Sequence, residues 1–213
     1  MASFSEMKKK VLDTTLEAYA AGLFAGTSGN LSMCDPSREF VAITPSNLRY
    51  ETMCEEDIMV IRMDGTVVEG GHRPSSEWRM HTGILASRPD VGAVVHTHSP
   101  YATSFAVIGL PIPLILIEML GFLGGDVPLA EFEMPGSAEL GTGALKALGR
   151  RHTCLLANHG VLAVGQSLEQ AYIRAVYVED AAKIYSLARS AGEPRLVPEY
   201  AAAAIRAKKG LKP

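Results

Sequence analysis

The sequence predicts an α/β sandwich in which many of the strands pair antiparallel. Segments with helical periodicity are mixed with short β-like runs along the whole chain. Two turn signals, Asp35-Pro36-Ser37 and Asp64-Gly65, each separate a pair of β-like runs and predict hairpins. These early hairpins exclude a simple repeat of strand–helix–strand units. The Gly-rich loop Gly26–Asn30 is followed by a strand rather than by a helix, which excludes a Rossmann fold.

The composition limits the classes of protein to which the chain can belong. The chain has 213 residues, of which 47% are apolar and 20% charged, so one domain with a sizeable core is expected over residues 1–213. A net charge of −3 gives no general attraction to nucleic acid or to anionic membranes. The three cysteines are odd in number and form no CxxC pair. They argue against a disulfide framework and suit a reducing cytosol.

Neither a signal peptide nor a membrane span is expected. The N-terminus carries charges at once and has no apolar h-region. The most apolar stretch, Ile108–Leu123, contains Pro111, Pro113 and Glu118, and it is too short and too interrupted to span a bilayer. The sequence therefore predicts a soluble, cytoplasmic protein with neither a nucleic-acid nor a membrane partner.

The first half of the chain is predicted to begin with a helix and to continue with hairpins. Ser3 and Glu6 have capping-box spacing, and helical periodicity then continues from about Phe4 to Phe24. The elements predicted next are the strands Leu31–Met33, Phe40–Thr44, Ile58–Met63 and Thr66–Glu69, and a helix from Trp78 that Pro89 stops.

The second half is predicted to alternate between buried strands and helices. Its predicted elements are a strand Ala93–His98, a helix after Pro100, an extended segment Pro111–Ile117, a Gly-rich passage through Gly121, Gly124 and Gly125, a helix from Ser137 to about Leu148, strands Thr153–Ala157 and Val161–Val164, and a helix from Ser167 to about Arg189. The tail from about residue 192 is expected to be mobile, with a short helix and a loose end.

Two histidines at the end of an apolar run are the first candidates for chemistry. In a strand that ends in His96-Thr97-His98, alternation places both imidazoles on one face. Unpaired buried polar groups cost about 1–3 kcal/mol each, and a shared metal ion would remove that cost. Taken alone, the pair is equally compatible with ordinary hydrogen bonds. Catalytic zinc commonly takes three protein ligands, and His159 is the best third, because it lies in a turn beside Gly160 between two apolar runs.

The remaining histidines and one glutamate need separate interpretations. His72, His81 and His152 are expected to be structural, since they lie in a polar hairpin end, inside a helix and after two arginines. Glu77 lies near the start of a predicted helix, where the helix dipole favours a carboxylate. From the local sequence alone, a capping glutamate is the simpler interpretation. Beside a metal, Glu77 could act as a general base with a pKa that its burial would raise.

Three small polar turns are candidates for binding an anion: Gly29-Asn30, Ser46-Asn47 and Ser75-Ser76. The third precedes a predicted helix, where backbone N–H groups and hydroxyls form an anion site. Each turn alone could be ordinary turn chemistry and capping. Three such turns beside a metal set predict a pocket for a small phosphorylated and hydroxylated substrate.

Together these motifs resemble the class II aldolase/adducin family, most closely its L-fuculose-1-phosphate aldolases. The resemblance covers roughly residues 11–185, and the motifs occur in the family's order at its approximate spacings. The segments that carry it are Gly26–Ser32, Ile43–Ser46, Pro74–Glu77, Val94–His98 and His159-Gly160.

The resemblance implies a three-layer αβα sandwich with a central, largely antiparallel, mixed sheet. It implies one divalent metal per subunit on His96, His98 and His159, usually Zn2+, although three imidazoles also accept Mn2+ or Co2+. Glu77 matches the acid/base of the aldolases, where the epimerases of the family carry aspartate. The implied phosphate-binding residues are Gly29, Asn30, Ser46, Asn47, Ser75 and Ser76. Family members are usually homotetramers with sites near subunit interfaces, and we expect the same.

Two positions depart from the aldolase pattern. Ser46-Asn47 replaces Thr-Gly in the second turn, and asparagine tolerates a left-handed backbone better than most residues. Ile117 stands where the aldolases carry a tyrosine that helps to protonate the aldehyde oxygen across the interface. Its neighbour Glu118 is a candidate replacement. The residues that choose the sugar are expected near 117–125 and in the tail.

The main functional hypothesis is a metal-dependent aldolase. It would cleave L-fuculose 1-phosphate or a similar ketose 1-phosphate reversibly to dihydroxyacetone phosphate and an aldehyde, with Glu77 moving the proton at the cleaved carbon. A pentulose-phosphate 4-epimerase or a dehydratase on the same site is the second hypothesis. The third is a non-catalytic, adducin-like interaction domain, which the complete set of histidines disfavours.

Overall fold

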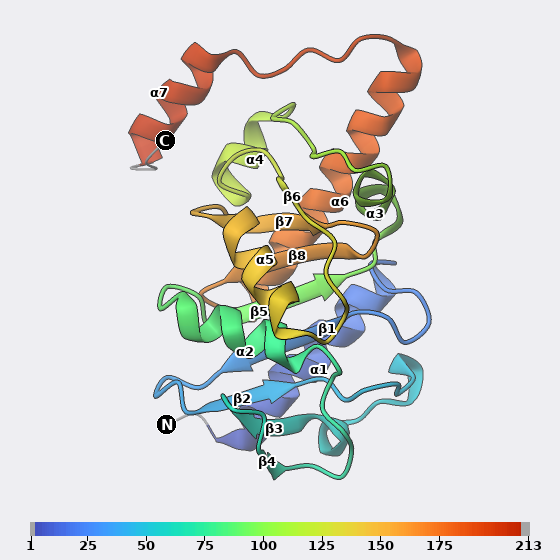
Figure 1. Cartoon of the computed structure of the whole chain (residues 1–213), viewed down its shortest axis with the longest axis vertical. Coiled ribbons are helices and arrows are strands. Elements are labelled where there is room, and N and C mark those ends of the chain that lie inside the picture. Colours follow the sequence, from blue (N-terminus) through green and yellow to red (C-terminus); the bar gives the residue numbers. More distant parts are fainter. Residues whose placement is uncertain (1–2, 210–213) are drawn as a thin grey trace.

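An eight-stranded mixed sheet forms the middle layer of the protein (Figure 1). The computed structural model describes residues 3–209. The strands follow the order β4-β3-β2-β1-β5-β8-β7-β6, and neighbours pair antiparallel except β6 and β7, which are parallel. The strands are β1 (Asn30–Cys34), β2 (Phe40–Ile43), β3 (Met59–Arg62), β4 (Val67–Glu69), β5 (Ala93–Thr97), β6 (Leu129–Ala130), β7 (Thr153–Leu156) and β8 (Gly160–Gly165).

Helices cover both faces of this sheet, because side chains alternate between the faces along each strand. The helices are α1 (Phe4–Ala20), α2 (Trp78–Ser87), α3 (Pro100–Val107), α4 (Ile117–Phe122), α5 (Ala138–Leu148), α6 (Leu168–Ala191) and α7 (Glu199–Lys209). In β5, Val94 packs into the core under α2 and α5, whereas Val95 packs into the core under α1 and α6. A third apolar cluster joins α3 and α4 to the second half of α6. The predicted αβα sandwich with a largely antiparallel sheet is therefore confirmed.

The first helix begins as predicted but ends earlier. The Ser3 hydroxyl accepts a hydrogen bond from the backbone N–H of Glu6 at the start of α1. The helix ends at Ala20 because Gly22 takes a left-handed backbone, with φ at 73°, and the chain then turns Leu23 and Phe24 into the core. The predicted end near Phe24 is wrong by about one turn.

The segment after α3 differs most from its prediction. An extended run to Ile117 and an irregular Gly-rich passage were expected, but only Ile112 makes a strand-like pair, with Val127. Ile117 instead begins α4, and the buried side chains of Met119 and Leu123 join the cluster against α3 and α6. This apolar packing outweighs the weak helix propensity of the glycine inside α4. Strand β6 and the 3-10 turns Tyr50–Thr52 and Glu55–Asp57 were not predicted either.

The tail contains the predicted short helix. Beyond α6, the Val197 N–H donates to the carbonyl of Leu114, and α7 lies against α4 with Ala202 fully buried (Figure 1). The predicted loose end beyond residue 209 lies outside the described residues. Among those residues, the helices are all too short or too polar to cross a membrane.

Candidate metal centre

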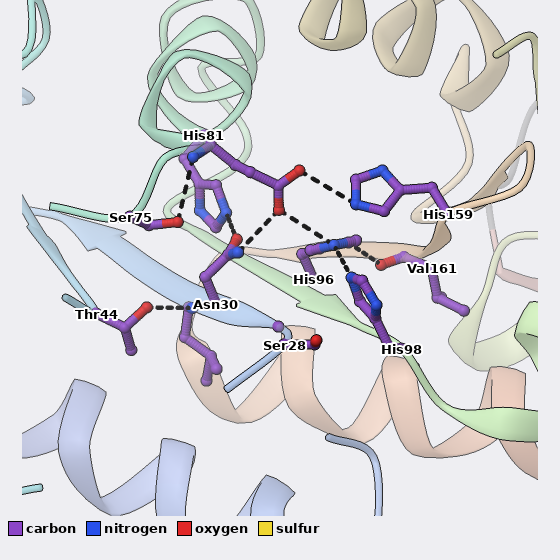
Figure 2. Close-up of polar contacts among 12 residues, drawn as sticks. Ser28, Asn30, Thr44, Ser75, His81, His96, His98, His159 and Val161 are labelled. Atoms are coloured by element: carbon purple, nitrogen blue, oxygen red, sulfur yellow. Dashed lines mark hydrogen bonds and ion pairs between the residues drawn. The ribbon is translucent and has the colours of Figure 1, made fainter. Parts of the chain in front are cut away.

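Three strands and one helix bring polar residues to one end of the sheet (Figure 2). His96 near the end of β5 lies directly opposite Asn30 at the start of β1. His159 lies in the turn just before β8. Val94 faces the core under α2, so His96, two residues later, faces the same side. Glu77, the residue before α2, lies on the same face of the sheet as His96.

The three predicted metal ligands converge at this place. One nitrogen atom from each of His96, His98 and His159 lies within 4.8 Å of the other two. Nε2 of His96 is 2.9 Å from Nε2 of His98. Nδ1 of His96 donates a hydrogen bond of 2.8 Å to the carbonyl of Val161. This bond leaves the unprotonated Nε2 of His96 directed at the cluster, which is the tautomer that a metal ligand requires.

Glu77 closes the cluster from the opposite side. Its Oε2 lies 3.2 Å from Nε2 of His96, and its Oε1 lies 3.3 Å from Nε2 of His159. The residue occupies the N-cap position of α2, but its side chain makes no capping hydrogen bond. The interpretation of Glu77 as a capping glutamate is therefore wrong.

The ionisation of this cluster differs from the expectation. Burial of Glu77 opposes its charged form, but the attraction of His96, the hydrogen bond from Asn30 and the attraction of His159 and His81 outweigh burial and lower the pKa of Glu77 to about 2. The predicted rise of this pKa is therefore wrong, although burial itself acts in the predicted direction. Burial also lowers the pKa of His96 to about 4 and that of His81 to about 3. At pH 7 the Glu77 carboxylate therefore lies beside neutral imidazoles at His96 and His81.

This arrangement fits a divalent cation. Among the described residues, the buried atom Oε1 of Glu77 has no hydrogen-bond partner, and it faces Nε2 of His159 at 3.3 Å. The lone pair of His96 Nε2 faces a carboxylate oxygen at 3.2 Å, and two electron pairs that close require a cation or a proton between them. Imidazole nitrogens in this number suit Zn2+ and related ions of the first transition row.

A pocket of about 320 Å³ opens beside the histidines. Its lining includes His98, His159 and all six predicted phosphate-binding residues: Gly29, Asn30, Ser46, Asn47, Ser75 and Ser76. Asn47 has a φ of 57°, so it does adopt the left-handed backbone expected of it. The second and third turns are held together, since the Ser75 N–H donates to the carbonyl of Thr44. The structure thus gathers three turns that are far apart in the sequence.

Gly160 permits the close approach of β8 to the histidine pair. A Cβ at this position would lie 2.3 Å from the carbonyl oxygen of Thr97. It would also lie 3.2 Å from the ring of His96 and 3.3 Å from the ring of His98. A larger residue would therefore push the turn that carries His159 away from the other two histidines.

The position of His81 beside this site was not predicted from the sequence. His81 was expected to be a structural helix residue, but it is fully buried and its Nε2 lies 2.5 Å from Oδ1 of Asn30. Spacing carries the signal that was missed. Glu77 and His81 are four residues apart and share one face of the turn into α2. Asn30 and Ser32 are two apart and share one face of β1.

The remaining two histidines and the two residues at the family's tyrosine position lie away from the cluster. His72 pairs with Asp57 at 2.8 Å on the surface, and His152 lies at the opposite end of β7. Ile117 and Glu118 belong to α4, and neither lines the pocket of its own chain.

Comparisons with known proteins point to one family. A family model described as "Class II Aldolase and Adducin N-terminal domain" matches residues 9–186. The chain is 40% identical over 194 residues to the 5-methylthioribulose-1-phosphate/5-deoxyribulose-1-phosphate aldolase of Rhodospirillum rubrum, covering 90% of this chain and 86% of that protein. It is 38% identical over 195 residues to the L-ribulose-5-phosphate 4-epimerase UlaF of Salmonella paratyphi C, covering 86% of each.

A solved structure is similar over nearly the whole chain. That structure, an L-fuculose 1-phosphate aldolase, has a TM-score of 0.92 and 39% sequence identity, and the match covers 99% of this chain and 98% of that one.

Proposed function

The chain belongs to the class II aldolase and adducin family, and from this premise we propose that it is a metal-dependent aldolase that acts on a ketose 1-phosphate. The reaction would yield dihydroxyacetone phosphate and an aldehyde, reversibly. One observation carries the proposal: three imidazoles and the carboxylate of Glu77 converge beside a pocket lined by three polar turns.

The histidines His96, His98 and His159 would hold the metal, and class II aldolases use a divalent one. We propose Zn2+, with Mn2+ or Co2+ as alternatives. When bound, such an ion supplies Lewis acidity toward the carbonyl and hydroxyl oxygens of the substrate. The hydrogen bond from His96 to the Val161 carbonyl supports this role, because it orients the ring toward the cluster.

The polar turns and Glu77 would carry out the rest of the reaction. The hydroxyls and N–H groups of the pocket would hold the phosphate and thereby fix the sugar relative to Glu77. Cleavage breaks the bond between the carbon next to the carbonyl and the adjacent carbinol carbon, whose hydroxyl loses its proton as the aldehyde forms. The electron pair stays on the carbon next to the carbonyl. Because Glu77 is ionised at pH 7, it would take up the proton that the hydroxyl releases and then deliver a proton to that carbon. In the synthetic direction the Glu77 carboxylate removes the same proton.

The choice between aldolase and epimerase depends on Glu77 and on the relatives. The relatives described above act by name on ketose 1-phosphates in two cases and on L-ribulose 5-phosphate in the third. Glutamate rather than aspartate at position 77 favours the aldolase. The similarity to UlaF keeps a 4-epimerase as the second candidate function.

A substrate panel tests the proposal. The purified protein is incubated with L-fuculose 1-phosphate, 5-deoxyribulose 1-phosphate and 5-methylthioribulose 1-phosphate, and dihydroxyacetone phosphate is detected by a coupled reduction. We expect release of dihydroxyacetone phosphate from at least one of the three. Conversion of L-ribulose 5-phosphate to xylulose 5-phosphate without any triose phosphate would instead establish the epimerase.

The assembly and the cellular location are also proposals. We propose a homotetramer with sites near subunit interfaces, because exposed apolar side chains such as Ile117, Phe132 and Met134 are suited to burial between subunits. Glu118 does not line the pocket of its own chain, so it could replace the family's tyrosine only from a neighbouring subunit. Light scattering of the purified protein tests the tetramer. Three free cysteines suit a reducing compartment, and we propose the cytoplasm.

A further inference from the structure

A continuous chain of buried hydrogen bonds lies behind Glu77. Nδ2 of Asn30 donates to Oε2 of Glu77 at 2.8 Å. Nε2 of His81 lies 2.5 Å from Oδ1 of Asn30. Nδ1 of His81 lies 2.7 Å from the hydroxyl oxygen of Ser32. Ser32 and His81 are fully buried and do not line the pocket, so neither can touch a substrate held there.

The chemistry of these four groups allows only one direction for the chain. An ionised Glu77 only accepts hydrogen bonds, so Asn30 must present its amide NH2 to it. The amide oxygen of Asn30 then faces His81, which must donate from Nε2. A neutral imidazole has one N–H, so Nδ1 of His81 must accept, and the Ser32 hydroxyl must donate to it. If any one member were reversed, the oxygen of Asn30 would face the carboxylate of Glu77 at 2.8 Å.

We propose that Ser32 and His81 are positioning residues for the reaction, which set the orientation of the Asn30 amide and through it hold the Glu77 carboxylate against His96 and His159. The inference rests on the proposed role of Glu77 as the acid/base. It assigns a task to His81 beyond filling the core under α2. A purely structural pair would need satisfied hydrogen bonds but no particular direction. The hydrogen-bond chain needs one fixed direction because it ends on Glu77, which would gain and lose a proton during turnover.

The hydrogen-bond chain also gives a reason for an asparagine at position 30, the first residue of β1. The amide oxygen of its side chain accepts from His81, and one amide N–H donates to Glu77. The backbone of the same residue lies opposite His96 in the sheet. The pocket side of Asn30 therefore offers a phosphate only what remains, a second amide N–H and backbone groups.

The activity test removes the hydroxyl of Ser32, the member of the hydrogen-bond chain farthest from Glu77, and leaves the residues that line the pocket unchanged. Ser32→Ala deletes one buried oxygen in the zinc-loaded full-length protein. Cys34→Ala is the matched control, because Cys34 lies on the same strand, is buried, and packs into the core on the face that carries Ser32. We expect Ser32→Ala to lower kcat about 10- to 100-fold, with KM within twofold and zinc content unchanged. Ser32→Thr, which keeps the hydroxyl, should recover most of the loss, and Cys34→Ala should lose less than threefold.

Two kinetic results would overturn the proposal. One is a kcat for Ser32→Ala equal to that of Cys34→Ala. The other is a loss of activity that follows a loss of zinc or a rise in KM, since the chain would then support the metal or the pocket rather than the carboxylate.

A spectroscopic measurement needs no variant that must remain active. In protein labelled with 15N-histidine, long-range proton–nitrogen correlation reports which ring nitrogen carries the proton. We expect His81 to show the Nε2–H tautomer, its signal being assigned by its absence in His81→Phe. An Nδ1–H tautomer at His81 would contradict the direction of the hydrogen-bond chain but not the proposed aldolase activity. Absence of aldolase activity on every ketose 1-phosphate, combined with the Nε2–H tautomer, contradicts the proposed function and leaves the direction of the chain supported.

Discussion

The strands β1, β5 and β8 have a hollow at each end, and the two hollows differ in size and in chemistry. At one end, the pocket beside His98 and His159 has a volume of about 320 Å³. At the other end, a larger hollow of about 590 Å³ lies between α1 and α6, and its lining includes Cys34, Gly92 and Gln166. The smaller hollow, not the larger, is lined by Glu77 and by two of the three converging imidazoles, those of His98 and His159.

The comparison teaches that unpaired polar groups locate a site better than volume does. Four buried side-chain polar atoms have no partner in the part of the chain that the structure describes, and two of them belong to residues that line the smaller hollow, Glu77 and His159. None of the four belongs to a residue that lines the larger one. A buried polar group without a partner costs free energy. At the smaller hollow a bound cation and substrate would remove that cost, whereas the larger hollow has no such cost to remove.

The largest expected effect comes from removing a metal ligand at the small hollow. His96→Ala should lose the metal and lower turnover by at least about 10²- to 10³-fold, the order lost with one electrostatic stabiliser. His152→Ala removes a half-buried histidine at the other end of the strands and should retain both metal and turnover. Metal analysis and the coupled assay measure the two variants side by side. Full activity of a metal-free His96→Ala protein would contradict the proposed mechanism.

Replacing the carboxylate should separate chemistry from metal binding. Glu77→Gln keeps the shape of the side chain but cannot move a proton, so kcat should fall about 10²- to 10⁴-fold while the histidines keep most of the metal. Glu169→Gln makes the same change in the lining of the larger hollow and should leave kcat within twofold. Steady-state kinetics with metal analysis decides the outcome, and equal effects of the two variants would erase the distinction between the hollows.

Two glycines compare packing at the two ends of the strands. A Cβ on Gly160 would lie 2.3 Å from the Thr97 carbonyl, and a Cβ on Gly92 would lie 2.4 Å from the Gln166 carbonyl. Both Gly160→Ala and Gly92→Ala should therefore destabilise the fold by about 1–3 kcal/mol. Only Gly160→Ala should also weaken zinc binding, because its Cβ presses on the rings of His96 and His98. Urea denaturation and zinc titration of both variants test this difference.

The last effect concerns stability in acid and is measured on the metal-depleted protein. Burial lowers the pKa of His81 to about 3, against about 6.5 in the unfolded chain. As the pH falls below 6.5, the unfolded state takes up the proton first, so the free energy of unfolding decreases until about pH 3. His81→Gln should flatten this dependence by up to about 1.4 kcal/mol per pH unit.

His152 provides the corresponding test at the opposite strand ends. Burial, together with Arg174 and Arg88, lowers its pKa to about 4. His152→Gln should therefore flatten the pH dependence in the same direction, but only between about pH 6.5 and 4. Urea denaturation at several pH values measures both slopes, and an unchanged slope in His81→Gln would show that the fold does not lower the pKa of His81.

The parts of the fold that local spacing determines were predictable. Alternation along β5 is enough to place His96 and His98 on one face, and the hairpin signals predicted antiparallel pairing. Capping pairs such as Ser3 with Glu6 and Ser167 with Gln170 predicted where α1 and α6 begin. Helix α4 was missed because its position depends on the packing of Met119 and Leu123 against α3 and α6, which no local pattern records.

By itself, the sequence determined which side chains could carry chemistry: the histidines, Glu77 and the three polar turns. It also determined their relations within each strand or helix, because those follow from the repeat of the backbone. Only the tertiary structure decided that Glu77 faces two imidazoles, that its pKa is lowered rather than raised, and that His81 supports it through Asn30. These depend on distances between elements that are far apart in the chain, such as those that carry Glu77 and His159. The packing of the whole sheet and its helices sets these distances.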